Sequence, residues 1–494
     1  MIGSKNFEIG PNEFLAGATS SASTSDGGFS NETRQVNITA KPGVLYAPGN
    51  YTNRSTNLAD EIIASCEDND FVGKNRMFLD ASSNLYSYNG TALTLEDDAT
   101  DGIFAQGTTD MVAWYDDAAS TPNFYMTTKA GDNGDIVKWN GTSTLDESWW
   151  ITTLGKTKLS QYTPWRPLLV YEKNLYIGDR NQLHRIAPDL TVSVGILTLA
   201  DGEMISSLGI DQGTGRMLIA TSNGANLNAS GAKNTRIMLY DGYSNKVSRV
   251  VPVSGLVTAF KSVGNTTFIF FDNRLGYWTG SGIEFLRTLN FAKGTTASLI
   301  YPHRTCSLDN TLYWVDTAKD GTYNANCQIM AYGEVINGNK IFYPVMYPAG
   351  AYTTSKSMTC LAPVSSTKLG FSYETPKFYD FDLTDIATIG TGGASIDFFS
   401  KRYDFPKEVT INGLLWEFDQ KLPTGDSNII GIRIVDSDGT ETTLPSINPG
   451  ARADMHSWES TYPTINTRSF QLKFGMLNKI AGVRRVTVFY TPKE

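Results

Sequence analysis

The chain has few of the residues on which most catalytic sites depend. Its 494 residues include three histidines and four cysteines, with no Cys-x-x-Cys pair. The histidines are His184, His303 and His456, and the cysteines are Cys66, Cys306, Cys327 and Cys360. Because these side chains lie far apart in sequence, a zinc site or a His-based triad is disfavoured. We expect buried thiols and structural histidines, and no metal or other cofactor.

Other signatures are also missing. There is no Gly-x-Ser-x-Gly elbow, no Gly-x-x-x-x-Gly-Lys loop and no His-Glu-x-x-His helix. The sequence therefore disfavours the common enzyme classes that these motifs mark: serine hydrolases, P-loop nucleotide-binding enzymes and zinc metalloproteases. No run of about 18 apolar residues exists, and the N-terminus lacks a signal-peptide core, so we expect no membrane span and synthesis in a cytoplasm without export. The net charge of −9 and the absence of basic clusters disfavour direct binding of nucleic acid, although DNA could pass along an acidic surface.

What the sequence does contain is a seven-fold repeat of paired strands. The first strand of each pair is short, aromatic and β-branched, and the second ends in an aromatic residue that Asn-Gly or Asp-Gly often follows. The first strands open at Met77, Phe124, Leu175, Met217, Phe268, Leu312 and Leu369. Their spacing of about 50 residues is the length of one propeller blade. A third strand precedes most pairs and a weaker fourth follows, which predicts an all-β, seven-bladed β-propeller over residues 44–390.

The two ends of the chain do not follow this repeat. Residues 1–43 include a low-complexity stretch from Gly17 to Ser30, which predicts an extended N-terminal arm that is disordered in isolation. After the Gly-rich joint at 389–394, longer strands alternate apolar and polar residues, and we expect a C-terminal β-sandwich over 391–494. The segment from Leu58 to Cys66 is the best helical candidate, and it could equally form an outer strand.

Two features are compatible either with ligand binding or with an ordinary structural role. Acidic turns at 67–70, 132–135 and 436–440 contain oxygen ligands suited to Ca²⁺, but Asp, Asn and Gly also make hairpin turns, and we favour turns. Trp149, Trp150 and Trp165 form the densest aromatic group and could stack on a sugar, although such rings also fill blade cores. The arginines Arg166, Arg180, Arg274 and Arg304 near blade tops are expected to form ion pairs.

Three segments together resemble virion structural proteins of tailed bacteriophages that carry a β-propeller, of the tail-tube, tail-nozzle or minor-tail type. They are the Ser/Thr-rich arm leading to Ile38-Thr-Ala-Lys-Pro-Gly-Val44, the repeated Leu-Tyr-x-x-Asp and Tyr-x-Gly strands, and Tyr403-Asp-Phe-Pro-Lys-Glu-Val409 before the last domain. The resemblance implies assembly into a symmetric ring with other copies and other virion proteins. It transfers no catalytic residues.

The leading hypothesis is therefore a non-enzymatic structural protein of a bacteriophage virion, in the tail or the tail-to-capsid apparatus, made in the host cytoplasm. A receptor-binding or glycan-binding module of a virion, with a host surface glycan as partner, is the alternative. A polysaccharide-cleaving propeller enzyme ranks last, because no matched pair of carboxylates stands out.

Overall fold

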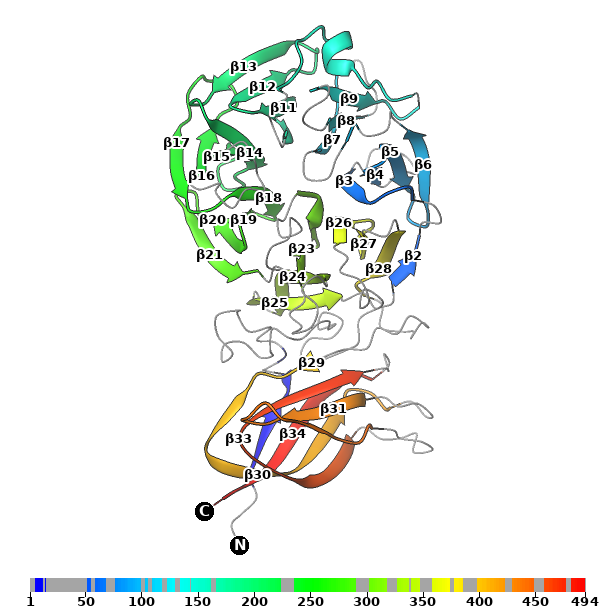
Figure 1. Ribbon diagram of the computed structural model, residues 1–494, viewed down its shortest axis with the longest axis vertical. Coiled ribbons are helices and arrows are strands. Elements are labelled where there is room, and N and C mark those ends of the chain that lie inside the picture. The colour runs from blue at the N-terminus through cyan, green and yellow to red at the C-terminus, as the bar shows by residue number, and fades with distance from the viewer. Residues whose placement is uncertain are drawn as a thin grey trace.

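The computed structural model describes residues 5–11, 14, 51–54, 58–67, 76–98, 103–104, 109–117, 122–128, 134–142, 144–160, 166–223, 235–289, 302–317, 327–336, 339–346, 358–373, 377–384, 398–422, 429–447, 457–476 and 481–493. Within these residues the fold is all-β with almost no helix, and seven small antiparallel sheets surround one axis as a seven-bladed β-propeller (Figure 1). A further sheet lies beside the rim of the ring, next to the sixth and seventh blades.

The first four blades follow one another along the chain. Blade 1 contains β3 (Ile62–Glu67), β4 (Arg76–Asp80), β5 (Asn84–Tyr88) and β6 (Leu93–Asp98). Blade 2 contains β7 (Met111–Trp114), β8 (Asn123–Thr127) and β9 (Ile136–Trp139). Blade 3 contains β10 (Leu168–Tyr171), β11 (Asn174–Asp179), β12 (Gln182–Ile186) and β13 (Val192–Thr198). Blade 4 contains β14 (Glu203–Ile210), β15 (Met217–Asn223), β16 (Thr235–Tyr240) and β17 (Arg249–Val253).

The remaining blades complete the ring. Blade 5 contains β18 (Val257–Val263), β19 (Thr266–Phe271), β20 (Arg274–Trp278) and β21 (Ile283–Thr288). Blade 6 contains β22 (Thr305–Leu308), β23 (Thr311–Thr317), β24 (Cys327–Ile336) and β25 (Asn339–Met346). Blade 7 contains β26 (Met358–Pro363), β27 (Lys368–Tyr373) and β28 (Lys377–Asp382), and its outer strand is β2 (Tyr51–Asn53), from the start of the chain. All seven predicted strand pairs are present.

Apolar layers between neighbouring blades hold the ring together. Each pair of adjacent blades shares a cluster of buried side chains, such as Phe124 with Leu79 between blades 1 and 2 and Phe78 with Phe378 between blades 1 and 7. A single four-stranded sheet cannot bury both of its faces alone, so closure of the ring supplies each blade with two neighbours. The expectation that blade aromatics fill these layers is confirmed.

The segment from Leu58 to Cys66 shows where a helical interpretation is wrong. Residues Ile62–Glu67 are β3, the first strand of blade 1, and β3 contacts the first strands of both neighbouring blades. Ile62 and Ile63 are fully buried, on opposite sides of the strand, in two different interblade clusters. Consecutive apolar residues that look like part of a helix are here the two buried faces of an inner strand.

The C-terminal strands form one hydrogen-bonded sheet. The strand order is β1-β34-β30-β33-β31-β32, with β29 also on β33. Its strands are β1 (Lys5–Ile9), β29 (Phe398–Phe399), β30 (Tyr403–Phe418), β31 (Ile429–Val435), β32 (Glu441–Thr443), β33 (Ser457–Met476) and β34 (Val483–Pro492). The first part of β33 pairs with β30 and its last part with β31, and Trp416 contacts Phe474 with ring centroids 5.0 Å apart. The predicted β-sandwich remains a prediction, because hydrogen bonds join all these strands in a single sheet.

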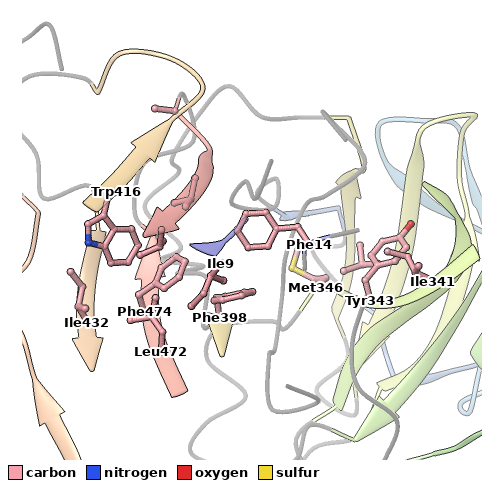
Figure 2. Packing of buried hydrophobic residues seen from close by; sticks show 14 of the residues in the cluster. Ile9, Phe14, Ile341, Tyr343, Met346, Phe398, Trp416, Ile432, Leu472 and Phe474 are labelled. Atoms are coloured by element: carbon pink, nitrogen blue, oxygen red, sulfur yellow. The ribbon is translucent and has the colours of Figure 1, made fainter. Parts of the chain in front are cut away.

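The N-terminal residues belong to both parts of the molecule. Lys5–Ile9, inside the predicted arm, is the edge strand β1 of the C-terminal sheet, antiparallel to β34. Phe14 is fully buried and belongs to the apolar cluster that runs from this sheet into blades 6 and 7. Figure 2 shows Phe14 between Phe398 on one side and Met346 of blade 6 on the other. The rest of the arm, residues 1–4, 12–13 and 15–43, lies outside the described residues.

Candidate functional site

The predicted aromatic site lies inside the molecule. Trp149 and Trp150 open a short π-helical turn, η1 (Trp149–Thr153), and each ring is 1% exposed. The Trp149 ring lies 4.7 Å from that of Tyr125, and the Trp150 indole N–H donates to the carbonyl of Thr157 over 2.8 Å. Both rings are core residues between blades 2 and 3, so neither presents a face for a sugar. Trp165 lies outside the described residues.

Beneath Trp150 lies a buried charge cluster that sequence reasoning did not assemble. It consists of Asp135, Arg166, Asp179 and His184, all less than 9% exposed. The Arg166 guanidinium donates to the carbonyl of Thr128 over 2.7 Å and to that of Ser160, and its Nε lies 3.6 Å from Oδ1 of Asp179. The expected ion pair of Arg166 is therefore present, to Asp179 of blade 3, and the hydrogen bond to the Thr128 carbonyl links Arg166 to blade 2.

The remaining contacts of the cluster fix the segment that carries Trp150. Asp135 accepts hydrogen bonds from the backbone N–H groups of Ile136, over 2.7 Å, and of Trp150, over 3.0 Å. Asp179 accepts from the backbone N–H of Ser160 over 2.9 Å. The carboxylates thus satisfy the backbone N–H groups of Trp150 and Ser160, in the segment that follows the three-stranded blade 2.

The pKa values of the two carboxyl groups in the cluster shift in opposite directions. Burial raises the pKa of Asp135 to about 6. The hydrogen bonds that it accepts from backbone N–H groups act in the opposite direction and lower the pKa. Burial also acts to raise the pKa of Asp179, but the hydrogen bond from His184, the Ser160 N–H and the charge of Arg166 together lower it. Burial lowers the pKa of Arg166, and both carboxylates oppose that change.

Asp110, at the start of blade 2, is a second carboxylate with a raised pKa. It accepts from the backbone N–H groups of Met111, over 2.9 Å, and Leu168, over 3.0 Å, and burial raises its pKa to about 6. A carboxyl group with a pKa near 6 is suited to acid–base chemistry. Here both Asp110 and Asp135 accept hydrogen bonds from backbone N–H groups, which is a structural use of a buried carboxyl group.

The middle of the ring is partly filled by the chain itself. The 3₁₀ turn η3 (Pro302–Arg304) contacts β3, β18, β22 and β26, which are first strands of four different blades. His303 and Arg304 are 5% and 3% exposed. Burial, with the charge of Arg304, lowers the pKa of His303 well below its usual value, so the imidazole is neutral at pH 7. This filling makes the axis of one propeller unsuitable as a path for DNA.

Two tyrosines, in the turns that follow β7 and β16, are exposed, whereas Trp149 and Trp150 are buried. Tyr243 is 56% exposed, and the guanidinium carbon of Arg185 lies 5.3 Å from its ring centroid. Tyr115 is 42% exposed and follows Trp114, whose indole N–H donates to the carbonyl of Lys173 over 2.6 Å. Exposed rings beside polar groups are the usual elements of a sugar-binding surface. Nothing in the sequence separated these tyrosines from the buried ones.

The other predicted features occupy ordinary structural positions. Asp436 accepts from the backbone N–H groups of Asp438 and Thr440, each over 2.9 Å, which is the predicted turn. Arg274 lies 3.5 Å from Asp272, as expected of an ion pair. Cys66, Cys306 and Cys360 are buried, and burial raises the pKa of Cys360 to about 11. His456 lies outside the described residues.

Two kinds of feature are absent from the described ranges. No group of three or more His, Cys, Asp or Glu side chains in them could hold a metal ion. None of their helices combines the length and the apolar character needed to cross a bilayer.

Comparison with known proteins assigns the chain to no family. No protein-family model matches the chain, and no curated protein matches it. Among solved structures the chain is similar to YCF48 bound to a D1 peptide, with 7% sequence identity and a TM-score of 0.43, over 68% of this chain and 97% of that one. A similarity at this level carries no conclusion about what the present chain binds.

Proposed function

We propose that the protein is a non-enzymatic structural component of a bacteriophage virion, in the tail or the tail-to-capsid apparatus, where copies assemble into a symmetric ring. The observation that carries the proposal is the construction of the C-terminal sheet from both ends of the chain, with β1 as its edge strand. The sequence resemblance implies a ring in which the N-terminal arm and the terminal domain contact neighbouring subunits, and this shared sheet supports that proposal.

The charges of the molecule support the same proposal. The net charge of −9 gives phosphate groups little to bind, so DNA would slide past a ring of copies without adhering. Because η3 contacts the inner strands of four blades, a DNA path in this proposal would run between subunits rather than through one propeller. Other copies of the chain and other virion proteins are then the partners, and the virion is the location.

The sites described above give a positive reason to set enzymatic activity aside. The carboxylates with raised pKa values accept hydrogen bonds from backbone N–H groups: Asp110 from Met111 and Leu168, and Asp135 from Ile136 and Trp150. A glycosidase needs two carboxyl groups that face the same glycosidic bond. Asp110 and Asp135 instead face the protein backbone.

Removal of the gene product from the particle tests the proposal. Phage that lack this chain should form no infective particles, and complementation with the intact chain should restore them. Particle composition by mass spectrometry should show the chain in multiple copies. Particles that assemble and infect normally without it would contradict a structural role.

A second candidate function is a receptor-binding or glycan-binding module, and the exposure of Tyr115 and Tyr243 favours it. If this module exists, Tyr115→Ala with Tyr243→Ala should weaken binding to host surface glycan at least tenfold, because stacking on both rings is lost. Trp150→Phe serves as a matched aromatic change in the core that should leave glycan binding unaltered. Unchanged binding by the double tyrosine variant would remove this alternative.

A further inference from the structure

The N-terminal segment 5–14, of which residues 5–11 and Phe14 are described, places Lys5–Ile9 in an apolar socket, defined here as the β34 edge of the C-terminal sheet with the aromatic side chains around Phe7. The pairing runs antiparallel from Lys5 opposite Tyr490 to Ile9 opposite Val486. The Phe7 ring contacts four aromatic rings, at centroid distances of 4.7 to 6.1 Å. Those four rings belong to Tyr403, Phe405, Phe470 and Tyr490. Without the N-terminal segment, this socket would expose a continuous aromatic surface.

An ion-pair chain and a second apolar residue strengthen the attachment. The Arg485 guanidinium lies 3.0 Å from Glu8 and also binds Glu417 of β30. Phe14, fully buried, contacts the ring of Phe398 edge-on at 5.7 Å. The segment therefore carries its own backbone pairing, its own charge contact and two buried side chains, Ile9 and Phe14.

The chain between this segment and the propeller is much longer than the attachment requires. Phe14 and Tyr51 pack against the same apolar cluster, so the two ends of the connection lie on one continuous core. Between them lie residues 15–50, which are 36 residues by direct count from the sequence. A chain of this length reaches about 120 Å when extended, at about 3.3 Å per residue. The same segment could therefore reach the socket of a neighbouring molecule.

The two sheet edges also bear on which strand enters the socket. The exposed side of β1 presents Lys5, Asn6 and Glu8, and the opposite edge strand, β32, begins with the exposed Glu441. Charged edge strands resist further pairing. The edge of β34, in contrast, is apolar and receives a strand. The occupant that fits it is residues 5–14 of this chain, from the same copy or another.

We propose that, in the assembled ring, the socket of each copy holds residues 5–14 of its neighbour. This exchange rests on the proposed ring assembly and names the contact that would build it. The contacts within one copy and between copies are the same, so exchange costs no new interface and is controlled by local concentration. Repetition of the same transfer around a ring satisfies every socket.

Cysteine cross-linking of mixed chains tests the exchange. One full-length chain carries Asn6→Cys and another carries Phe489→Cys, positions that face each other across β1 and β34. After co-expression and oxidation, we expect a covalent dimer, because only a strand from another copy can place these two cysteines together. A mixture of Asn6→Cys with Thr279→Cys, an exposed turn residue of blade 5, is the control and should give no dimer.

Two further measurements keep the outcomes distinct. The double variant Asn6→Cys/Phe489→Cys reports pairing within one chain, and Lys5→Cys with Tyr490→Cys, the next pair in the register, replaces the first pair if a variant does not fold. Mass photometry measures the oligomer directly. Oligomers that give only within-chain cross-links overturn the exchange and leave the ring intact. Monomers at every concentration overturn both, and the absence of any cross-link overturns the pairing of β1 in the socket.

Discussion

At the scale of single residues, burial and local charge decide the behaviour of Asp135 and Asp179. The two carboxyl groups belong to one cluster, yet only Asp179 faces Arg166 and His184 closely enough to have its pKa lowered. Asp135 receives only backbone N–H groups, and burial raises its pKa to about 6. Their effects on stability should therefore have opposite dependence on pH.

Asp135→Asn tests the first of these effects. Because the folded pKa lies above the unfolded value, protonation favours the fold, and the wild-type protein loses stability as pH rises from about 4 to about 6. The Asn variant keeps an oxygen for the Trp150 N–H but does not titrate. Relative to wild type it should gain up to about 3 kcal/mol in unfolding free energy between pH 4 and 7.

Denaturant unfolding at several pH values measures this difference, with Asp179→Asn as the matched control. Its wild-type carboxylate has a lowered pKa, so its contribution is present above the unfolded pKa and is lost as pH falls toward the folded one. A stability difference for Asp135→Asn that does not change with pH would refute the assigned role of burial.

Trp150→Ala tests the core assignment of the predicted sugar-binding ring. The side chain is 1% exposed and contacts the His184 ring at 5.7 Å, so its removal leaves a cavity between blades 2 and 3. We expect a loss of about 3–5 kcal/mol in unfolding free energy. Tyr243→Ala, at a ring that is 56% exposed, should change stability by less than about 0.5 kcal/mol. Equal effects of the two changes would contradict the structure.

At the scale of elements, β2 closes the propeller with a strand from the far end of the chain. Tyr51 packs edge-on against Phe371 and Tyr379, and Arg54, just after β2, lies 2.8 Å from the 2%-exposed side chain of Asp380. Asp380 also accepts from the Tyr88 hydroxyl of blade 1. This contact joins the first and last blades, so opening the ring requires its loss.

Arg54→Ala should weaken that closure. The change leaves the buried carboxylate of Asp380 without its cation, which we expect to cost about 1–3 kcal/mol in unfolding free energy. Lys493→Ala removes an exposed ion pair with Glu408 and should cost less than about 1 kcal/mol. Asp380→Asn in the Arg54→Ala background should recover part of the loss. If the two single variants are equally stable, Arg54 does not hold the ring closed.

The sequence predicts the blades because their middle strands repeat. Leu175 to Asp179 and Leu312 to Asp316 share the Leu-Tyr-x-x-Asp pattern, and each lies in the second strand of its blade. β2 has only three residues, too few to show alternation, and it pairs with a strand more than 300 positions away. The charge cluster around Arg166 was equally hidden, because neighbouring blades bring its members together only after folding.

At the scale of the whole molecule, three features support the proposed structural role. The propeller axis is partly filled by η3, the charge cluster is covered by Trp150, and the C-terminal sheet takes its edge strand from the N-terminus. One apolar cluster runs from this sheet into blades 6 and 7, so the sheet and the propeller share a continuous core. Such coupling suits a subunit that is held by its neighbours.

Cryo-electron microscopy of virus particles that contain this chain tests the central claim most directly. The account predicts several copies in a closed ring around the tail or the tail-to-capsid axis, with the C-terminal sheets in contact with neighbouring subunits. Density for residues 5–14 should enter the socket of the adjacent copy. A single peripheral copy without subunit contacts, or particles that lack the chain, would contradict a structural role in the virion.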